Sequence, residues 1–241
     1  NARAFTRRYL EAGLRDRAIT RDLDWGIDVP LPGYEDKKIY IWAENVLGYL
    51  SATAAACAAR RLNFSDYWGQ DSYHYYIHGK DNIPFHTIIL PGLLLAHGGG
   101  YHLPDAVLSS EHITLQGRKV STSAGWAVWA ADLLELYDPD AIRYFFIANG
   151  PQRRDADFTF AQFATRNNAE LVGIYGNFIH RTLAFVNRYL DSAVPRGQLD
   201  PGLCRAVEET FAQTGDDLEK GRLREALARV IELARLGNRY F

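Results

Sequence analysis

The chain has 241 residues, a formal net charge of −2 at pH 7 and a hydrophobic content of 47%. This length is enough for one large domain, or for two smaller domains that each bury a core. The near-neutral charge excludes a strongly basic protein, so any contact with nucleic acid must come from a local patch.

Strand and helix patterns alternate through the first half of the chain. The predicted helices are 2–13, 44–61 and 83–97, and the predicted strands are 38–42, 71–78, 106–110 and 112–115. A polar connection, residues 15–32, separates the first helix from the first strand and ends in a proline-rich turn. The alternation of strands and helices predicts a parallel α/β sheet.

The second half of the chain changes to helical patterns. The predicted helices are 131–137, 140–149, 158–187, 203–214 and 217–237, with a loop at 191–202. The last of these helices keeps most of its leucines on one face, which is typical of a helix that packs against others. The predicted fold class is therefore an α/β sheet domain followed by an α-helical bundle.

The two cysteines, Cys57 and Cys204, lie far apart in the sequence, and there is neither a C-x-x-C pair nor a Cys/His knuckle. We therefore expect no metal site and a reducing, cytoplasmic location. No apolar run reaches the roughly 18–20 residues of a membrane span, so no membrane contact is expected. The chain begins with Asn1 and contains no methionine, and we expect it to be a piece of a longer protein.

The segment Gly79-Lys80-Asp81-Asn82 follows a predicted strand and precedes a predicted helix. Open α/β sheets bind ligands at this kind of strand-to-helix turn. Gly79 would let a ligand approach the backbone, and Asp81 could accept hydrogen bonds from ribose hydroxyls. The alternative is an ordinary turn with a helix N-cap.

A second segment, residues 115–123, combines a glycine turn, two basic residues and a cluster of hydroxyls. A loop rich in cations and donors suits the phosphates of a nucleotide. A solvated surface loop is the alternative for this segment.

Aromatic side chains mark a third group, in which Trp42, Tyr49 and His86 could line an apolar pocket with one polar group. Each of them alone is also typical of a core residue. On the predicted helix 158–187, Asn177 and Arg181 lie four residues apart and could hydrogen-bond an unstacked base. They could equally be a helix surface pair.

In this order and spacing, residues 79–86, 117–123 and 140–145 resemble the methionyl-tRNA synthetases, a family of class I synthetases. The likeness runs along nearly the whole chain, from Phe5 to Phe241, and residues 119–123 are similar to the K-M-S-K-S signature in the form K-V-S-T-S. The resemblance implies the second half of a Rossmann-like nucleotide-binding domain at 1–104. A connecting region with the signature loop would follow at 105–160, and a truncated anticodon-binding-like bundle at 161–241.

The resemblance implies a methionine–tRNA ligase, which activates methionine with ATP to the acyl-adenylate and transfers it to tRNA(Met). ATP would be bound as its Mg²⁺ complex, with no zinc site in this segment. The implied roles are catalysis for Lys119, Ser121 and Ser123; ATP binding for Gly79, Asp81 and Lys119; the amino-acid pocket for Trp42, Tyr49, Asn82 and His86; and the anticodon for Asn177 and Arg181.

The sequence departs from the family pattern at three places. The H-I-G-H motif is absent, so the chain is expected to be inactive alone. Thr122 stands where many members have the second lysine of the signature, and the chain ends before the family's anticodon-stacking tryptophan. Two alternatives therefore stay open. One is a synthetase-like paralogue that activates an amino acid without tRNA, and the other is a non-catalytic module that binds tRNA or a protein partner.

Overall fold

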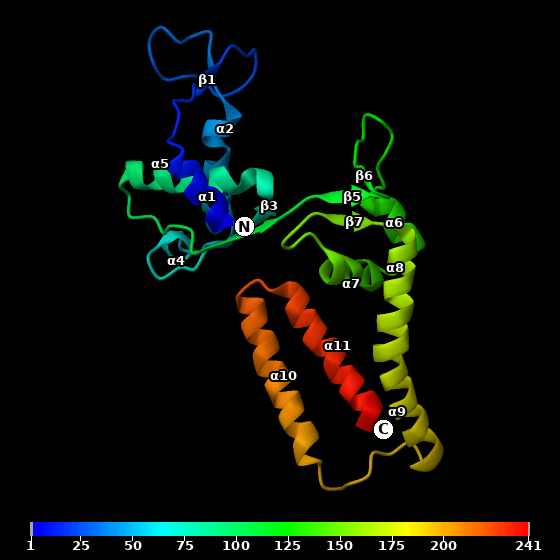
Figure 1. Ribbon diagram of the computed structural model, residues 1–241. Coiled ribbons are helices and arrows are strands. Elements are labelled where there is room, and N and C mark those ends of the chain that lie inside the picture. Colours follow the sequence, from blue (N-terminus) through cyan, green and yellow to red (C-terminus); the bar gives the residue numbers. More distant parts are fainter. Residues whose placement is uncertain (1, 241) are drawn as a thin grey trace. The chain divides into compact units, whose positions relative to one another are not determined.

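The computed structural model describes residues 2–240, and the chain forms two compact units, residues 1–110 and 111–241 (Figure 1). Asn1 and Phe241, the ends of the predicted first and third regions, lie outside the described residues. The division of the chain into three functional regions stays a prediction.

The first unit has a two-stranded parallel sheet with helices around it (Figure 1). Its elements are α1 (Ala2–Glu11), β1 (Thr20–Arg21), β2 (Lys38–Ile39), α2 (Ile41–Glu44), η1 (Asn45–Leu47), α3 (Gly48–Arg60), α4 (Ser65–Trp68), β3 (Tyr75–Gly79), η2 (Lys80–Asn82), η3 (Phe85–Ile89), α5 (Leu90–His97) and β4 (Ala106–Ser110). Strands β3 and β4 pair in parallel, as the alternating pattern predicts, but the predicted strand 71–78 is wrong at its start, because β3 begins at Tyr75. The core is formed by Val46, Trp68, Tyr76, Leu90 and Leu94.

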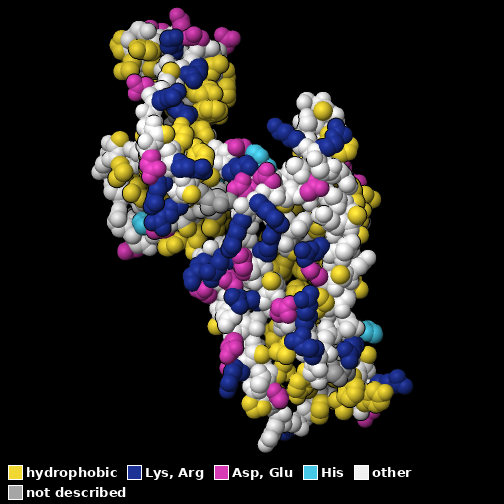
Figure 2. All heavy atoms as spheres, in the orientation of Figure 1, with side chains coloured by type: hydrophobic (Ala, Val, Ile, Leu, Met, Phe, Trp, Pro, Cys, Tyr) yellow, Lys and Arg dark blue, Asp and Glu magenta, His cyan; other side chains and the backbone are white. Residues whose placement is uncertain are grey.

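The predicted strand 38–42 is wrong over most of its length. Only Lys38 and Ile39 form β2, which pairs antiparallel with β1, a strand inside the segment predicted as a polar connection. Ile41 begins the short helix α2, so Trp42 lies on a helix rather than at a strand end. The β1–β2 segment exposes apolar side chains, with Trp25 89% exposed, and hydrophobic side chains gather at this end of the first unit in Figure 2.

The predicted helix 83–97 consists of two different helical forms. Residues 85–89 form a π-helix, η3, and residues 90–97 form the α-helix α5. Pro91 follows directly on the π-helix, and because it has no N–H it cannot donate a helical hydrogen bond at the junction of the two forms. Gly98 ends the helix in a left-handed conformation with φ of 70°.

The second unit combines a small sheet with a helical bundle (Figure 1). Its elements are β5 (Ile113–Leu115), β6 (Arg118–Lys119), α6 (Ala130–Leu136), α7 (Pro139–Asn149), β7 (Ala156–Phe158), α8 (Phe160–Arg166), η4 (Asn167–Gly176), α9 (Asn177–Tyr189), α10 (Pro201–Glu219) and α11 (Leu223–Tyr240). The strand order is β6-β5-β7, with β5 and β6 antiparallel and β5 and β7 parallel.

Two predicted boundaries in the second unit are wrong. The long helix does not include Phe158, which closes β7 opposite Leu115, and the helix begins two residues later at Phe160. The last two helices divide at residues 220–222 rather than at 215–216, because Gly221 rather than Gly215 takes the left-handed conformation.

A buried carboxylate and a close backbone approach are among the features that hold the helices of the bundle together. Asp217 on α10 is 1% exposed and accepts hydrogen bonds from Nε of Arg222 and Nε of Arg229, each at 2.6 Å. On α11, a Cβ added at Gly237 would lie 2.4 Å from Cε2 of Phe178 on α9. Glycine at this position lets α9 and α11 approach closely.

Candidate active site

A chain of hydrogen bonds in the first unit joins Tyr49, His86 and Asn82. The phenol oxygen of Tyr49 lies 2.9 Å from Nε2 of His86, and Nδ1 of His86 lies 2.9 Å from the carbonyl oxygen of Asn82. A carbonyl oxygen can only accept, so Nδ1 carries the proton and Nε2 accepts the phenol proton. The structure therefore brings together three of the four residues predicted for the amino-acid pocket.

His86 is 5% exposed, and its surroundings keep it neutral. Burial lowers the pKa of His86 below its ordinary value of 6.5 and outweighs the hydrogen bond to the Asn82 carbonyl, which raises it, while the nearby imidazole of His78 lowers the pKa further. The two imidazole rings stack with centroids 4.3 Å apart. A neutral His86 keeps Nε2 as an acceptor and so holds the Tyr49 ring in one orientation.

Trp42, the fourth residue of the predicted pocket, lies on α2 and is 51% exposed. Its indole meets the ring of Phe85 edge-on at 5.7 Å and tilts against Tyr40 at 5.5 Å. Phe85 is the residue before His86, so the η3 π-helix presents one ring toward Trp42 and the next toward Tyr49. Phe85 was not predicted as a pocket residue, although its place beside His86 in the motif was a signal.

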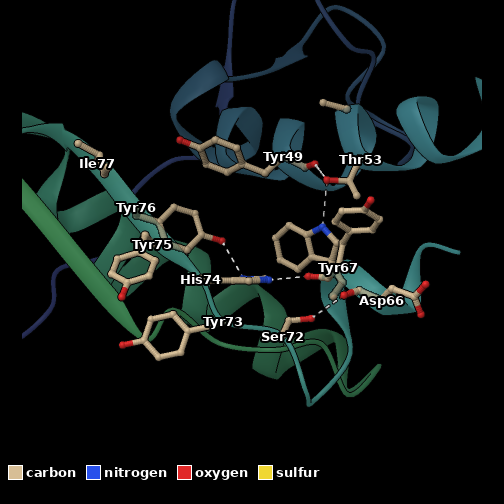
Figure 3. Close-up of a pocket in the computed structure, with 12 residues that line it drawn as sticks. Tyr49, Thr53, Asp66, Tyr67, Ser72, Tyr73, His74, Tyr75, Tyr76 and Ile77 are labelled. Carbon is tan, nitrogen blue, oxygen red and sulfur yellow. Dashed lines mark hydrogen bonds between the residues drawn. The ribbon is translucent and has the colours of Figure 1, made fainter. Parts of the chain in front are cut away.

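An open cleft of about 650 Å³ lies beside this group and has Tyr49 in its wall (Figure 3). Tyr76, on β3, meets the ring of Tyr49 edge-on at 5.4 Å, and Trp68 donates from its indole to the Thr53 hydroxyl at 3.1 Å. Burial raises the pKa of Tyr76 to about 12, so its phenol keeps its proton. Sequence reasoning missed the role of Tyr76 as a support for Tyr49, because a tyrosine on a strand is commonly a packing residue.

The predicted ATP-binding residues Gly79 and Asp81 lie where β3 ends. Gly79 is the last strand residue, opposite Ser110 of β4, and precedes the short helical turn η2. A Cβ added at Gly79 would have no heavy atom within 4 Å, so the space beside this backbone is open. Asp81 is exposed. The strand-to-helix turn has the place and the openness expected of a ligand site.

The predicted phosphate loop lies in the second unit as a hairpin extension of β5 and β6. Gln116 and Gly117 form the tight turn with φ of 53° and 74°, and the Gly117 N–H donates to Asp157 at 2.8 Å. Lys119 ends β6 and is exposed. The Ser121 hydroxyl lies 3.3 Å from the Ser123 hydroxyl, which brings together two of the three residues predicted for catalysis.

The predicted anticodon residues Asn177 and Arg181 converge on one residue of α11. The Asn177 amide donates to the side-chain oxygen of Asn238 at 3.0 Å, and Arg181 donates to its backbone carbonyl at 3.3 Å. Asn238 also donates to the carbonyl of Ile174 at 2.9 Å. Asn177 and Arg181 are thus an ordered, exposed polar pair on the bundle.

In the part of the chain that the structure describes, no three His, Cys, Asp or Glu side chains are grouped to hold a metal ion. None of the helices among residues 2–240 has the length and apolar character needed to cross a bilayer.

Comparison with known proteins gives one consistent result. The family model of the class I tRNA synthetases (M) matches residues 1–183. The chain is 48% identical to methionine–tRNA ligase 1 of Alkaliphilus oremlandii and 44% identical to methionine–tRNA ligase of Bacillus cereus (strain AH187), each over all of this chain and 44% of the relative.

The fold is also that of a solved synthetase. A crystal structure of Mycobacterium tuberculosis methionyl-tRNA synthetase bound by methionyl-adenylate matches all of this chain and 46% of its own, with a TM-score of 0.85 and 25% identity. The chain therefore spans less than half the length of the relatives it matches. The match of the family model to residues 1–183, well over half of the sequence, shows that this chain belongs to the class I tRNA synthetase (M) family.

Proposed function

We propose that this chain is part of a methionine–tRNA ligase. The enzyme would join methionine to the α-phosphate of ATP as methionyl-adenylate, release pyrophosphate, and pass the methionyl group to the terminal ribose of tRNA(Met). The names of the relatives and the adenylate-bound structural match support this proposal. We expect the chain to be inactive alone, and the whole protein to work in the cytoplasm.

The observation that carries the proposal is the contact between Tyr49 and neutral His86. This contact orients the phenol of Tyr49, and the indole of Trp42 packs against Phe85, the neighbour of His86 in the sequence. These aromatic rings would form the walls of the pocket for the methionine side chain. The unbranched thioether of methionine suits such walls, because sulfur is polarizable and contacts aromatic rings favourably. A charged or branched side chain would fit this surface less well.

For ATP, we propose separate roles for residues of the first unit and for residues of the second unit. Asp81 would accept hydrogen bonds from ribose hydroxyls, next to the open backbone of Gly79. Lys119 would neutralise phosphate charge, and Ser121 and Ser123 would donate hydrogen bonds to phosphate oxygens. The Mg²⁺ that accompanies ATP would enter as part of the substrate complex. Catalysis of this kind depends on positioning and charge stabilisation.

The tRNA half of the proposal uses Asn177 and Arg181. Their convergence on Asn238 orders both side chains on one face, and unstacked bases are recognised by such amide and guanidinium groups. Replacing both by alanine should raise the tRNA concentration needed for aminoacylation and leave adenylate formation unchanged.

Amino-acid-dependent ATP–pyrophosphate exchange by the full-length gene product tests the proposal. Exchange with methionine, tested against the other amino acids, followed by charging of tRNA(Met), is the expected result. Exchange without tRNA charging would favour the paralogue that activates an amino acid without tRNA. Absence of exchange from a well-folded protein would reject the enzymatic function and favour a binding module.

A further inference from the structure

The two neighbouring cations of strand β6 face opposite sides of the sheet, because side chains alternate along a strand. Arg118 is opposite Leu115, and Lys119 is opposite Thr114. Leu115 is buried in the core cluster against which Trp126 packs, whereas Thr114 is only partly buried. Arg118 therefore lies on the core side of the hairpin, and Lys119 lies on the other side.

Trp126 connects the two ends of the loop that contains Lys119. Its indole N–H donates to the carbonyl of Leu115 at 3.0 Å, on the strand before the turn. Its backbone exchanges two hydrogen bonds of 2.8 Å with Ser121, which closes residues 122–125 into a tight turn. The Trp126 side chain thus adds a link between this loop and β5, beside the pairing of β5 with β6.

Arg118 covers this tryptophan. The guanidinium carbon lies 4.1 Å from the centre of the Trp126 ring, in cation–π geometry. Among residues 2–240, the Arg118 side chain has no ion pair or hydrogen bond with another group. The positive charge of Arg118 therefore interacts with the face of the Trp126 ring and not with a carboxylate.

We propose that Arg118 and Trp126 are positioning residues for the phosphate loop. Their stack holds β6 and residues 121–126 in one arrangement, and Lys119, on the opposite face of the same strand, is presented to the phosphates. This inference rests on the function proposed above. It assigns Arg118 to the loop and Lys119 to the nucleotide.

A double-mutant cycle in the full-length protein tests the pair. The variants are Arg118→Met, Trp126→Leu and the double variant, and the matched controls are Arg205→Met and Trp129→Leu, which alter exposed residues of the same unit. The measurement is methionine-dependent ATP–pyrophosphate exchange, with kcat and the KM values for ATP and methionine determined separately.

We expect each single variant to lower kcat by about tenfold, as mispositioned groups do, with the KM for methionine unchanged. The double variant should be no slower than Trp126→Leu, because Arg118 acts through the ring. The inference is wrong if Arg118→Met has no effect. It is also wrong if Arg118→Met lowers kcat as strongly in the Trp126→Leu background, since Arg118 would then contact the phosphates itself.

Hydrogen–deuterium exchange of residues 116–126 separates this inference from the proposed function. In Arg118→Met, the amides of Ser121 and Trp126 should exchange faster than in the unmodified protein and in Arg205→Met. This measurement needs no enzymatic activity. It therefore still tests the role of Arg118 if the unmodified protein shows no ATP–pyrophosphate exchange. The amide-exchange measurement uses only Arg118→Met, so it remains possible if Trp126→Leu fails to fold. Unchanged amide exchange would overturn the proposal.

Discussion

Tyr49 and His86 are 37 residues apart in the sequence, yet the phenol of one donates a 2.9 Å hydrogen bond to the imidazole of the other. The bond links α3 to the π-helix η3, and it leaves His86 with no proton on the nitrogen that faces Tyr49. The orientation of the Tyr49 ring therefore depends on Nε2 of His86 remaining unprotonated.

Replacing Tyr49 with phenylalanine should leave His86 with a buried acceptor that has no partner. The Tyr49 ring also loses the bond that fixes its orientation, and for a bond of about 1–3 kcal/mol we expect the KM for methionine to rise by at most roughly five- to 150-fold. The KM for ATP should stay unchanged. Pyrophosphate exchange at varied methionine and varied ATP measures both. An equal rise in the two constants would contradict a role of Tyr49 in the amino-acid pocket.

The depressed pKa of His86 predicts lower stability in acid. Above pH 6.5, His86 is neutral in both the folded and the unfolded state, so its contribution to stability is complete. As the pH falls through 6.5, the unfolded state takes up the proton more readily, and the free energy of unfolding decreases. Urea unfolding at pH 7.5 and 5.5 should show a larger decrease for the unmodified protein than for His86→Gln. Equal decreases would show that His86 titrates normally.

Trp42→Ala should weaken the binding of methionine far more than that of ATP, because we propose that the indole, which packs against Phe85, is a wall of the amino-acid pocket. Trp25→Ala removes a tryptophan that is 89% exposed and is the matched control. Isothermal titration of the full-length enzyme with each substrate measures the two affinities. A similar loss for both substrates would point to a structural role for Trp42.

Asp81→Ala should weaken ATP binding by roughly 1.5–3 kcal/mol, the value of a hydrogen bond to a charged group, or about ten- to 150-fold. Asp71→Ala changes an exposed carboxylate of the same unit and should have no effect. Titration with ATP measures both variants. Unchanged ATP affinity in Asp81→Ala would reject the assignment of Asp81 to the ribose.

Two glycine-to-alanine substitutions in the bundle should act in opposite directions. The new methyl at Gly237 would lie 2.4 Å from Phe178, so Gly237→Ala should destabilise the protein by about 1–3 kcal/mol. Gly215, inside α10, has no atom within 4 Å of the added Cβ, and Gly215→Ala should stabilise by about 0.5–1 kcal/mol. Thermal unfolding measures both, and Phe178→Leu should partly restore Gly237→Ala.

The sequence predicted the elements whose signals are local. The parallel strand β4 was predicted at residues 106–110, and α7 was predicted from the Asp138-Pro139-Asp140 start, where Asp138 does accept from the Asp140 N–H at 2.8 Å. Capping side chains and strand alternation depend on neighbouring residues, so they can be read without knowledge of the rest of the fold.

The elements that depend on distant partners were predicted less well. The aromatic run 38–42 has strong strand propensity, but only Lys38 and Ile39 find a partner, which is β1. Trp42 instead lies on the helix α2, where its indole meets the ring of Phe85 edge-on. The bond from Tyr49 to His86 could not be predicted from either segment, because it requires the relative placement of two helices.

The ten residues Asn167–Gly176 between α8 and α9 form a π-helix within one long helical run. Each hydrogen bond in a π-helix spans one more residue than in an α-helix, so the direction in which successive side chains point drifts relative to 3.6-residue periodicity. The side chains of α9 therefore do not lie on the faces that the periodicity of residues 160–166 would predict for them. A helical wheel drawn through the whole run would place Asn177 and Arg181 on the wrong side, and a single-residue deletion within 167–176 would rotate them away from Asn238.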